Sequence, residues 1–128
     1  QQVAVIRAMS DELHPTIRII ALETVRDTDG LALSSRNARL STGSRLQAQV
    51  IPRTLQAIAN LHAQGETRSD VLKSEGLEIL GLVPNMQVEY LEIVQQDTLN
   101  AVDEARNAVL LFAGVLDGVR LIDNLLLQ

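Results

Sequence analysis

The sequence predicts a chain of two parts, the end of an α/β domain followed by a small α+β domain. Residues 2–13 carry apolar side chains at helical spacing, and residues 16–23 form a nearly continuous run of β-branched and aliphatic side chains. After residue 40 the pattern changes to two helices and then three strands, with no further alternation of strand and helix. This change predicts that residues 1–37 end the first domain and that residues 38–128 form the second.

The first predicted element is an amphipathic helix over residues 2–13, whose apolar face carries Val3, Ile6, Met9 and Leu13. His14-Pro15 should end this helix, because a residue before proline avoids the helical conformation. Residues 16–23 then predict a strand that is covered on both faces, since they lack polar alternation. In open parallel sheets, ligands bind beyond the carboxyl ends of strands, which is where residues 24–37 begin.

Two helices are predicted in the second domain. Ser41 or Ser44 can cap the first of them, and Gly65 should end it. Pro52 should kink or break this helix, because proline lacks the backbone N–H and clashes with the preceding turn. The apolar face of the helix is expected to carry Leu46, Val50, Ile58 and Leu61.

A second helix and three strands complete the predicted domain. Ser69 can cap this helix, which should stop by Pro84-Asn85. Alternating or apolar runs predict strands over residues 88–94, 108–116 and 119–122. Asp117-Gly118, between the last two strands, is typical of a tight hairpin turn. Together these elements predict a three-stranded antiparallel sheet packed by two helices.

The composition limits the class of protein. The chain has 128 residues, enough for one main hydrophobic core. No apolar run approaches the roughly 20 residues that cross a bilayer, and no cleavable leader is visible. We therefore expect a soluble, cytoplasmic protein without membrane contact. The absence of cysteine excludes disulfides, thiolate metal ligands and a cysteine nucleophile.

The net charge of −5 is unevenly distributed along the chain. Residues 30–65 contain no acidic side chain and four basic ones, namely Arg36, Arg39, Arg45 and Arg53. This segment would attract a nucleotide and its leaving pyrophosphate, although chance clustering of surface arginines explains Arg45 and Arg53 equally well. We expect no nucleic-acid partner, because the overall charge is negative and only Tyr90 and Phe112 can stack on bases.

The most informative segment is Asp29–Asn37, which reads Asp-Gly-Leu-Ala-Leu-Ser-Ser-Arg-Asn. Gly30 can adopt a positive φ, so the backbone can turn sharply and present Ser34 and Ser35 to a phosphate. Arg36 adds a planar cation that matches phosphate oxygens. The segment therefore predicts phosphoryl or nucleotidyl transfer, in which negative charge on phosphorus must be neutralised. The alternative is an ordinary capped or solvated loop, since short polar runs after glycine are common.

Four further segments occur with this loop, in the order Gln1-Gln2-Val3, Ile6–Met9, Thr24-Val25-Arg26 and Arg120–Asn124. The ordered set resembles the C-terminal part of the pantoate–β-alanine ligase (pantothenate synthetase) family over nearly the whole chain. In that family the pieces read Lys-Asp-x-Gln-Gln, Asp-Gly-Leu-Ala-Met-Ser-Ser-Arg-Asn and Arg-Leu-Ile-Asp-Asn. The sequence starts at the two glutamines and lacks the family's ATP signature His-x-Gly-His. We therefore expect a C-terminal portion that is inactive by itself.

The resemblance implies an ATP-dependent ligase of the coenzyme A pathway. In the family, pantoate and ATP give a pantoyl adenylate and pyrophosphate, and the amine of β-alanine then displaces AMP to form pantothenate. Mg²⁺ accompanies ATP as cosubstrate, and we expect neither to bind this portion tightly. Residues 1–37 would end a Rossmann-like nucleotidyltransferase domain, and residues 38–128 would form its lid. The implied partners are the missing N-terminal domain and, because the family is dimeric, a second copy.

The resemblance assigns the catalytic and ATP-binding groups to one loop. Ser34, Ser35 and Arg36 match the loop that closes on the triphosphate, which resembles the lysine-serine phosphate loop of class I aminoacyl-tRNA synthetases. Hydroxyl and guanidinium donors suit the charge that develops on phosphorus as the carboxylate attacks. Loops of this kind are mobile until substrate binds.

Three more residues match substrate-binding positions of the family. Gln2 matches a glutamine that binds pantoate; alternatively, it is a frayed terminal residue. Val25 matches a position that contacts adenine through its backbone and side chain; alternatively, it is a core valine at a strand end. Leu33 stands where the family has methionine, and its similar volume should preserve packing on the adenine.

The remaining polar candidates do not suggest a second site. His14 and His62 lie far apart without acidic or cysteine partners at ligand spacing, so we expect surface histidines and no metal site. Glu89 and Glu92 should lie on opposite faces of a strand and therefore should not form an acid–base pair.

A function of another class is also compatible with the sequence. The same fold could be a non-catalytic docking or assembly module that binds a partner domain and has no nucleotide site of its own. Arg120 and Asp123 belong to the last of the family segments, but we interpret them as a cross-strand or turn-fixing pair rather than as catalytic groups.

Overall fold

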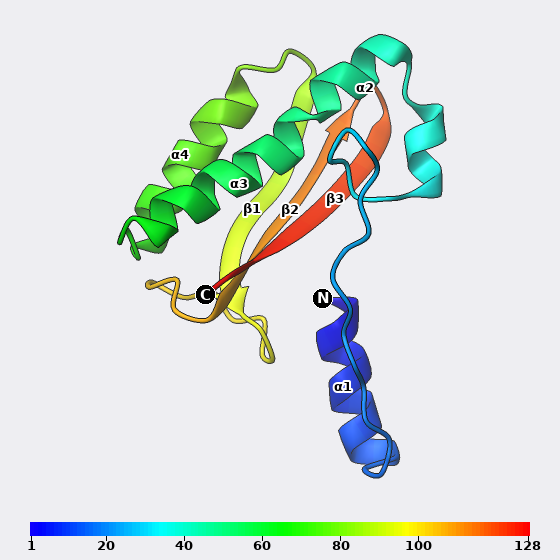
Figure 1. The fold of residues 1–128 in the computed structure, drawn as a ribbon, viewed down its shortest axis with the longest axis vertical. Helices are drawn as coiled ribbons and strands as arrows, with labels where there is room; N and C mark the ends of the chain where they lie inside the picture. The colour runs from blue at the N-terminus through cyan, green and yellow to red at the C-terminus, as the bar shows by residue number, and fades with distance from the viewer.

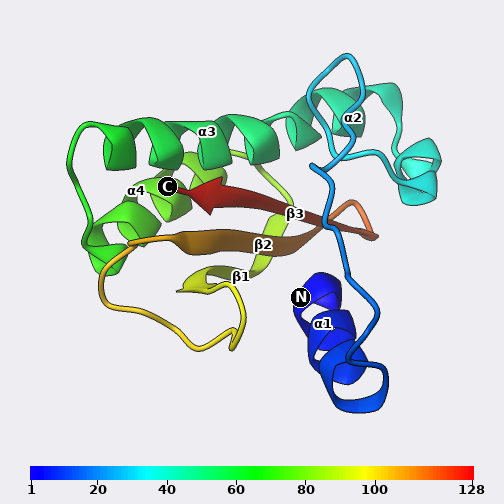
Figure 2. The ribbon, with the colours of Figure 1, turned by 60° about the horizontal axis from the view of Figure 1, so that its bottom comes forward.

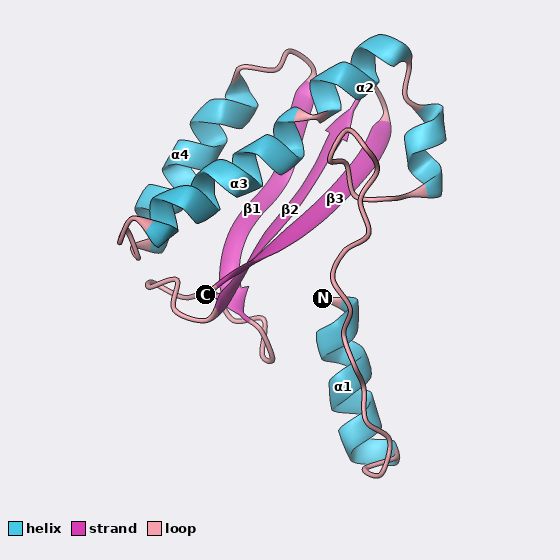
Figure 3. Cartoon of the chain, viewed as in Figure 1, coloured by secondary structure: helices cyan, strands magenta, loops and turns pink.

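The computed structural model describes residues 1–128 and contains four α-helices, one 3₁₀ helix and one sheet (Figure 1). The helices are α1 (Gln2–Leu13), η1 (Ser35–Arg39, 3₁₀), α2 (Thr42–Ala48), α3 (Val50–Ala63) and α4 (Ser69–Gly81). The strands are β1 (Met86–Gln95), β2 (Ala108–Leu116) and β3 (Val119–Leu127). All three strands follow the last helix (Figure 3). This segregation of helices and strands confirms the α+β class predicted for the second part of the chain.

The strands form one antiparallel sheet in the order β1-β2-β3, and α3 and α4 cover one of its faces (Figure 2). The two-residue turn Asp117-Gly118 joins β2 to β3, with positive φ angles of 47° and 77°. Positive φ at both central residues suits the right-handed twist of a hairpin, so the predicted hairpin is confirmed. A β-bulge between Val88 and Tyr90 interrupts the pairing of β1 with β2.

The hydrophobic core lies between the helical layer and the sheet. Its most buried side chains come from α3, α4 and the strands, and they include Leu55, Ile58, Leu72, Phe112 and Leu127. Leu31 belongs to the same core, although it precedes all the elements that build it. Removing apolar area from water favours folding by about 25 cal/mol per Å². The burial of Leu31 therefore attaches the segment around it to the packed domain.

The first helix predicted for this domain is divided in two. α2 ends at Ala48 and α3 begins at Val50. Pro52 has no N–H for the Ala48 carbonyl, and its ring would clash with that carbonyl, which explains the break. Leu46 of α2 is 63% exposed, so its predicted place on the apolar face is wrong.

The helix starts agree only in part with the predicted caps. Ser41 caps α2, because its Oγ accepts a hydrogen bond from the Ser44 N–H at 3.1 Å. The Ser44 hydroxyl instead donates to the Asp117 carboxylate, which ties the start of α2 to the β2–β3 turn. The prediction that Ser69 caps α4 is wrong. Arg68 holds the cap position without a side-chain hydrogen bond, and Ser69 is the first residue of the helix.

Residues 1–25 lie outside the packed unit. α1 forms where it was predicted, projects away from the sheet (Figure 1), and buries only Ala4 and Ser10. The strand predicted over residues 16–23 is not formed, because this extended segment has no neighbouring strand to complete its hydrogen bonds. None of the helices combines the length and the apolar character that a bilayer crossing requires.

Candidate functional site

A tight turn precedes the Ser-Ser-Arg triplet. The Asp27 N–H donates to the Leu31 carbonyl at 2.9 Å, and the Leu33 N–H donates to the Val25 carbonyl at 2.8 Å. Gly30 has a φ of +86°, in the left-handed region predicted for it, and its N–H donates back to the Asp27 carbonyl at 2.9 Å. The chain therefore reverses direction here and leads directly into the triplet.

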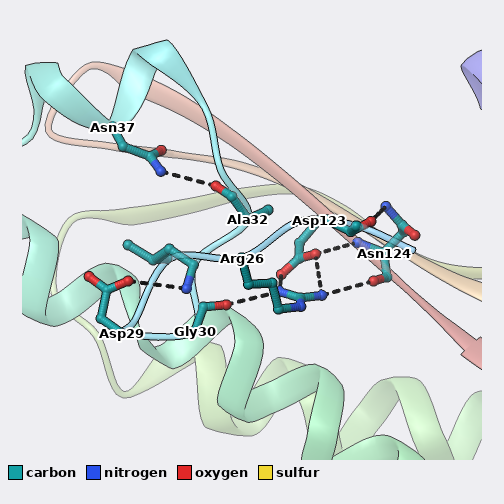
Figure 4. Close-up of polar contacts among 9 residues, drawn as sticks. Arg26, Asp29, Gly30, Ala32, Asn37, Asp123 and Asn124 are labelled. Atoms are coloured by element: carbon teal, nitrogen blue, oxygen red, sulfur yellow. Dashed lines mark hydrogen bonds and ion pairs between the residues drawn. The ribbon is translucent and has the colours of Figure 1, made fainter. Parts of the chain in front are cut away.

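Arg26 holds this turn against β3 (Figure 4). Its Nη1 and Nη2 atoms donate to Oδ2 and Oδ1 of Asp123 at 2.8 and 2.9 Å. Nη1 also donates to the Gly30 carbonyl at 3.0 Å, and Nη2 donates to the Asn124 carbonyl at 3.3 Å. Hydrogen bonding to Asp123 raises the pKa of Arg26 above its ordinary value, although partial burial opposes this. The pair joins two segments that are 97 residues apart in the sequence.

A second arginine, Arg45 of α2, binds the acidic residues of the turn. Its Nε donates to Asp29 Oδ2 at 2.7 Å, and its Nη2 donates to Asp27 Oδ2 at 2.6 Å. The pKa of Asp27 lies below its ordinary value, first because the Thr28 N–H bonds to the carboxylate and next because of Arg45. These contacts assign Arg45 to holding the turn rather than to attracting a nucleotide.

The triplet itself is exposed. Ser34 Oγ accepts a hydrogen bond from the Arg36 N–H at 3.2 Å and caps η1, which begins at Ser35. Ser34 therefore acts as a helix cap, as the alternative interpretation of this segment predicted. The guanidinium of Arg36, in contrast, forms no ion pair. Asn37 is buried and its Nδ2 donates to the Ala32 carbonyl at 3.0 Å, which closes the end of the loop (Figure 4).

A hollow of about 210 Å³ lies between this loop and β3. The loop contributes Leu33, Ser34 and Arg36 to its lining, and β3 contributes Arg120 and Asn124. Hydroxyl, amide and guanidinium groups therefore line one space, and such donors suit an anion. Leu33 is 64% exposed and offers an apolar surface beside them. The arrangement can hold a ligand that has an anionic part and an apolar part.

The structure gathers half of the predicted site residues at this hollow. Gln2 is the exposed first residue of α1. Val25 is 67% exposed and is not part of the hydrophobic core of this chain. The predicted residues that line the hollow are Leu33, Ser34 and Arg36. Those that do not are Gln2, Val25 and Ser35.

Arg120 and Asp123 do not pair with each other, which corrects the interpretation of these residues as one pair. Arg120 binds Glu89 across the sheet, with Nη2 to Oε2 at 2.7 Å, whereas Asp123 holds the turn described above. Glu92 binds Lys73 of α4 at 2.6 Å. The two glutamates of β1 therefore have separate cationic partners.

The contact between Arg26 and Asp123 was not predicted from the sequence. No local pattern joins residues that are 97 positions apart, so spacing rules could not reveal it. The available signal was that both residues stand in segments that carry the family resemblance. His14 follows α1 and is exposed, and His62 lies half-buried in the last turn of α3. The structure contains no group of three or more histidine or acidic side chains that could together hold a metal ion.

Sequence comparison places the chain among known proteins. A family model described as pantoate-beta-alanine ligase matches residues 1–126. The pantothenate synthetase of Pseudomonas fluorescens (strain Pf0-1) is 47% identical over 129 residues, and that of Paracoccus denitrificans (strain Pd 1222) is 43% identical over 126 residues. These alignments cover 98% and 97% of this chain but only 44% of each relative. The chain thus spans less than half the length of these relatives.

Solved structures agree with the sequence comparison. A crystal structure of pantothenate synthetase from Thermus thermophilus superposes with a TM-score of 0.90 and 38% identity, covering 97% of this chain and 45% of that one. The pantoate-beta-alanine ligase of Francisella tularensis, solved with beta-gamma ATP and beta-alanine, superposes with a TM-score of 0.60, 23% identity and coverage of 98% and 39%. The second similarity supports the fold alone.

Proposed function

The chain belongs to the pantoate–β-alanine ligase family, and from this we propose that it is the C-terminal portion of an ATP-dependent ligase that condenses pantoate with β-alanine. The full reaction would run through a pantoyl adenylate and would release pyrophosphate and AMP. One observation carries the proposal: the exposed Ser34–Arg36 triplet sits on a turn held by two arginines, and it borders a hollow lined by hydrogen-bond donors.

The triplet would act in the first half-reaction. When the pantoate carboxylate attacks the α-phosphorus of ATP, negative charge grows on the phosphate oxygens and on the departing pyrophosphate. Hydroxyl groups of Ser34 and Ser35 and the unpaired guanidinium of Arg36 are donors of the kind that stabilises such charge. Mg²⁺ would arrive with the phosphates of ATP. The nearby carboxylates of Asp27 and Asp29 are already bound to Arg45.

Three further residues would bind the rest of the substrates. The exposed side chains of Val25 and Leu33 would contact the adenine. Both backbone groups of Val25 would bond to the ring: the N–H as a donor, and the carbonyl through the lone pair that the Leu33 N–H leaves free. Gln2 would donate its amide to pantoate. Because it lies away from the hollow, this role requires surfaces from the upstream part of the protein.

The upstream part would also cover the apolar surface of residues 1–25. We propose that residues 1–37 complete a nucleotide-binding domain and that residues 38–128 form its lid. The exposed side chains that the missing domain would cover include Val5, Met9, Ile20 and Leu22. The chain would be inactive without this domain, and the complete protein would form a homodimer. Its reaction substrates are small soluble molecules, which suits an enzyme of the cytoplasm.

The experiment that tests the proposal is Arg36→Ala in the full-length protein. We expect pyrophosphate release from ATP and pantoate to slow by about 2 to 4 kcal/mol of activation free energy, the usual effect of losing one charge-stabilising donor. Arg39→Ala is the matched control, because Arg39 is an exposed arginine of the same short helix and does not line the hollow. Normal adenylate formation by the Arg36→Ala protein would refute the assignment.

The second candidate function is a docking module without its own nucleotide site. The exposed apolar surface of α1 and of the segment after it favours this candidate. Calorimetric titration with Mg²⁺-ATP tests the docking module for the chain alone. Affinity of about 1 mM or tighter would indicate a residual nucleotide site and would exclude the docking module, whereas absence of heat is compatible with both candidates. We expect very weak binding or none, because much of the proposed pocket lies upstream.

A further inference from the structure

The ion pair between Arg26 and Asp123 differs from the other ion pairs of the molecule in its burial. The Asp123 side chain is 2% exposed, whereas every other acidic partner is at least 16% exposed. A buried carboxylate is costly unless its oxygens are satisfied. Both oxygens of Asp123 bind Arg26, and Oδ1 also accepts the Asn124 N–H at 2.7 Å. The pair is therefore stable in one arrangement, with both terminal nitrogens of the guanidinium engaged.

This arrangement fixes the base of the loop that carries the triplet. Arg26 bonds to the Gly30 carbonyl at 3.0 Å, which sets the apex of the turn relative to β3. The antiparallel backbone bridge between Arg26 and Ala32 then fixes the place of the chain that follows the turn. Ala32 itself lines the hollow, and Ser34 follows two residues later in the same lining. Hydrogen bonds thus link Asp123 through Arg26 to the Gly30 carbonyl (Figure 4), and the bridged backbone then leads to the edge of the proposed site.

We propose that Arg26 and Asp123 are positioning residues, which set the place of Ser34 and Arg36 against β3 without touching the nucleotide themselves. The proposal rests on the proposed function of the triplet. It follows that the place of the phosphate loop depends on the packed domain of residues 38–128. A shift of about 1 Å in such a group can slow a reaction about 100-fold, so a pair of this kind can matter as much as a residue that touches substrate.

The direct test uses Arg26→Lys and Asp123→Asn in the full-length protein. Lysine keeps the charge but not the planar fork that bonds both oxygens. We expect kcat/KM for ATP to fall about 10- to 100-fold in each variant, while KM for β-alanine changes less than about threefold. If Asp123→Asn does not fold, Arg26→Lys alters only the partly exposed partner and keeps the test available.

The matched control is Glu92→Gln, which breaks the Lys73–Glu92 ion pair at a different hollow of the same domain. We expect this variant to keep its kcat/KM for ATP. If Arg26→Lys lowers the melting temperature but leaves both kinetic constants for ATP unchanged, the pair is merely structural and the inference is overturned.

A double-mutant cycle with Arg36→Ala separates this inference from the function on which it rests. If Arg26 acts through the triplet, Arg26→Lys should lower kcat/KM for ATP less than about threefold in a protein that already carries Arg36→Ala. If the double variant instead loses kcat/KM by the product of the two single losses, the inference is overturned and the proposed function remains intact. If Arg36→Ala alone has no effect, the proposed function fails, and the inference fails with it.

Discussion

Residues 1–25 and residues 38–128 both contain many apolar side chains, yet they use them in opposite ways. In the second region such side chains fill a core between two helices and a sheet. In the first region α1 forms as its pattern predicts but buries only Ala4 and Ser10, and Leu22 is 87% exposed. The apolar pattern of α1 therefore determines a helix, whereas burial of its apolar face requires a second surface that the helix can pack against.

The segment between the two regions, residues 26–37, makes its contacts with the second one. Leu31 packs into the core, and Arg45 and Asp123 of the packed domain hold the turn from two elements. The proposed site therefore lies at the edge of the stable region rather than at the tip of the exposed one. This contrast predicts large differences in local stability between the two regions. Changes at the turn that connects them should alter the stability of the fold only slightly.

The largest expected effect is a contrast in amide hydrogen exchange. A helix of 12 residues without tertiary packing is marginal in water, so α1 should open with a free energy of about 0 to 1 kcal/mol. Amides of β2 should exchange only through global unfolding, at about 5 to 15 kcal/mol. Equal protection of α1 and β2 in the isolated chain would contradict the contrast. In the full-length protein we expect protection of α1 to rise, because the upstream domain would cover it.

The next effect compares one buried and one exposed apolar side chain. Phe112→Ala should lower the free energy of unfolding by about 3 to 5 kcal/mol, because Phe112 is fully buried in the core and alanine would leave a cavity. Leu22→Ala should change it by less than about 0.5 kcal/mol. Urea denaturation of both variants measures the difference. A loss of similar size at both positions would show that residues 1–25 are packed after all.

A smaller effect is expected at the start of α2. Ser41→Ala should cost about 1 kcal/mol of unfolding free energy, because the Ser44 N–H loses its acceptor. Ser41→Gly should cost only a few tenths of a kcal/mol, because glycine is tolerated at the cap position. Denaturant titration of the pair checks the result. If the two variants are equally destabilised, the contribution of Ser41 does not come from capping.

The smallest effect is a pH dependence at the connecting turn. The pKa of Asp27 is lowered in the folded state, so the carboxylate stabilises the fold above its unfolded-state pKa. That contribution is lost as the pH falls below about 4 and through the folded-state pKa. Thermal melting of the wild-type chain and of Asp27→Asn should therefore converge on acidification. A difference that grows toward low pH would contradict the sign of this shift.

Local rules succeeded where one short segment decides the outcome. The helix over residues 2–13, the turn at Asp117-Gly118 and the left-handed Gly30 all follow from sequence alone, because each depends on a few neighbouring residues. The strand predicted over residues 16–23 failed because a strand needs a partner from elsewhere in the chain. The prediction for Leu46 failed because its burial depends on whether another element covers α2 at that position, which periodicity within one helix does not determine.

By itself, the sequence determined the helices, the hairpin, the Ser-Ser-Arg triplet and the family to which the chain is similar. Only the tertiary structure decided that Arg26 pairs with Asp123, that Arg45 binds the turn and that Ser34 and Arg36 share a hollow with β3. The physical reason is range. Dihedral preferences and hydrophobic periodicity act between neighbours along the chain, whereas ion pairs and burial depend on groups that folding brings together across the whole molecule.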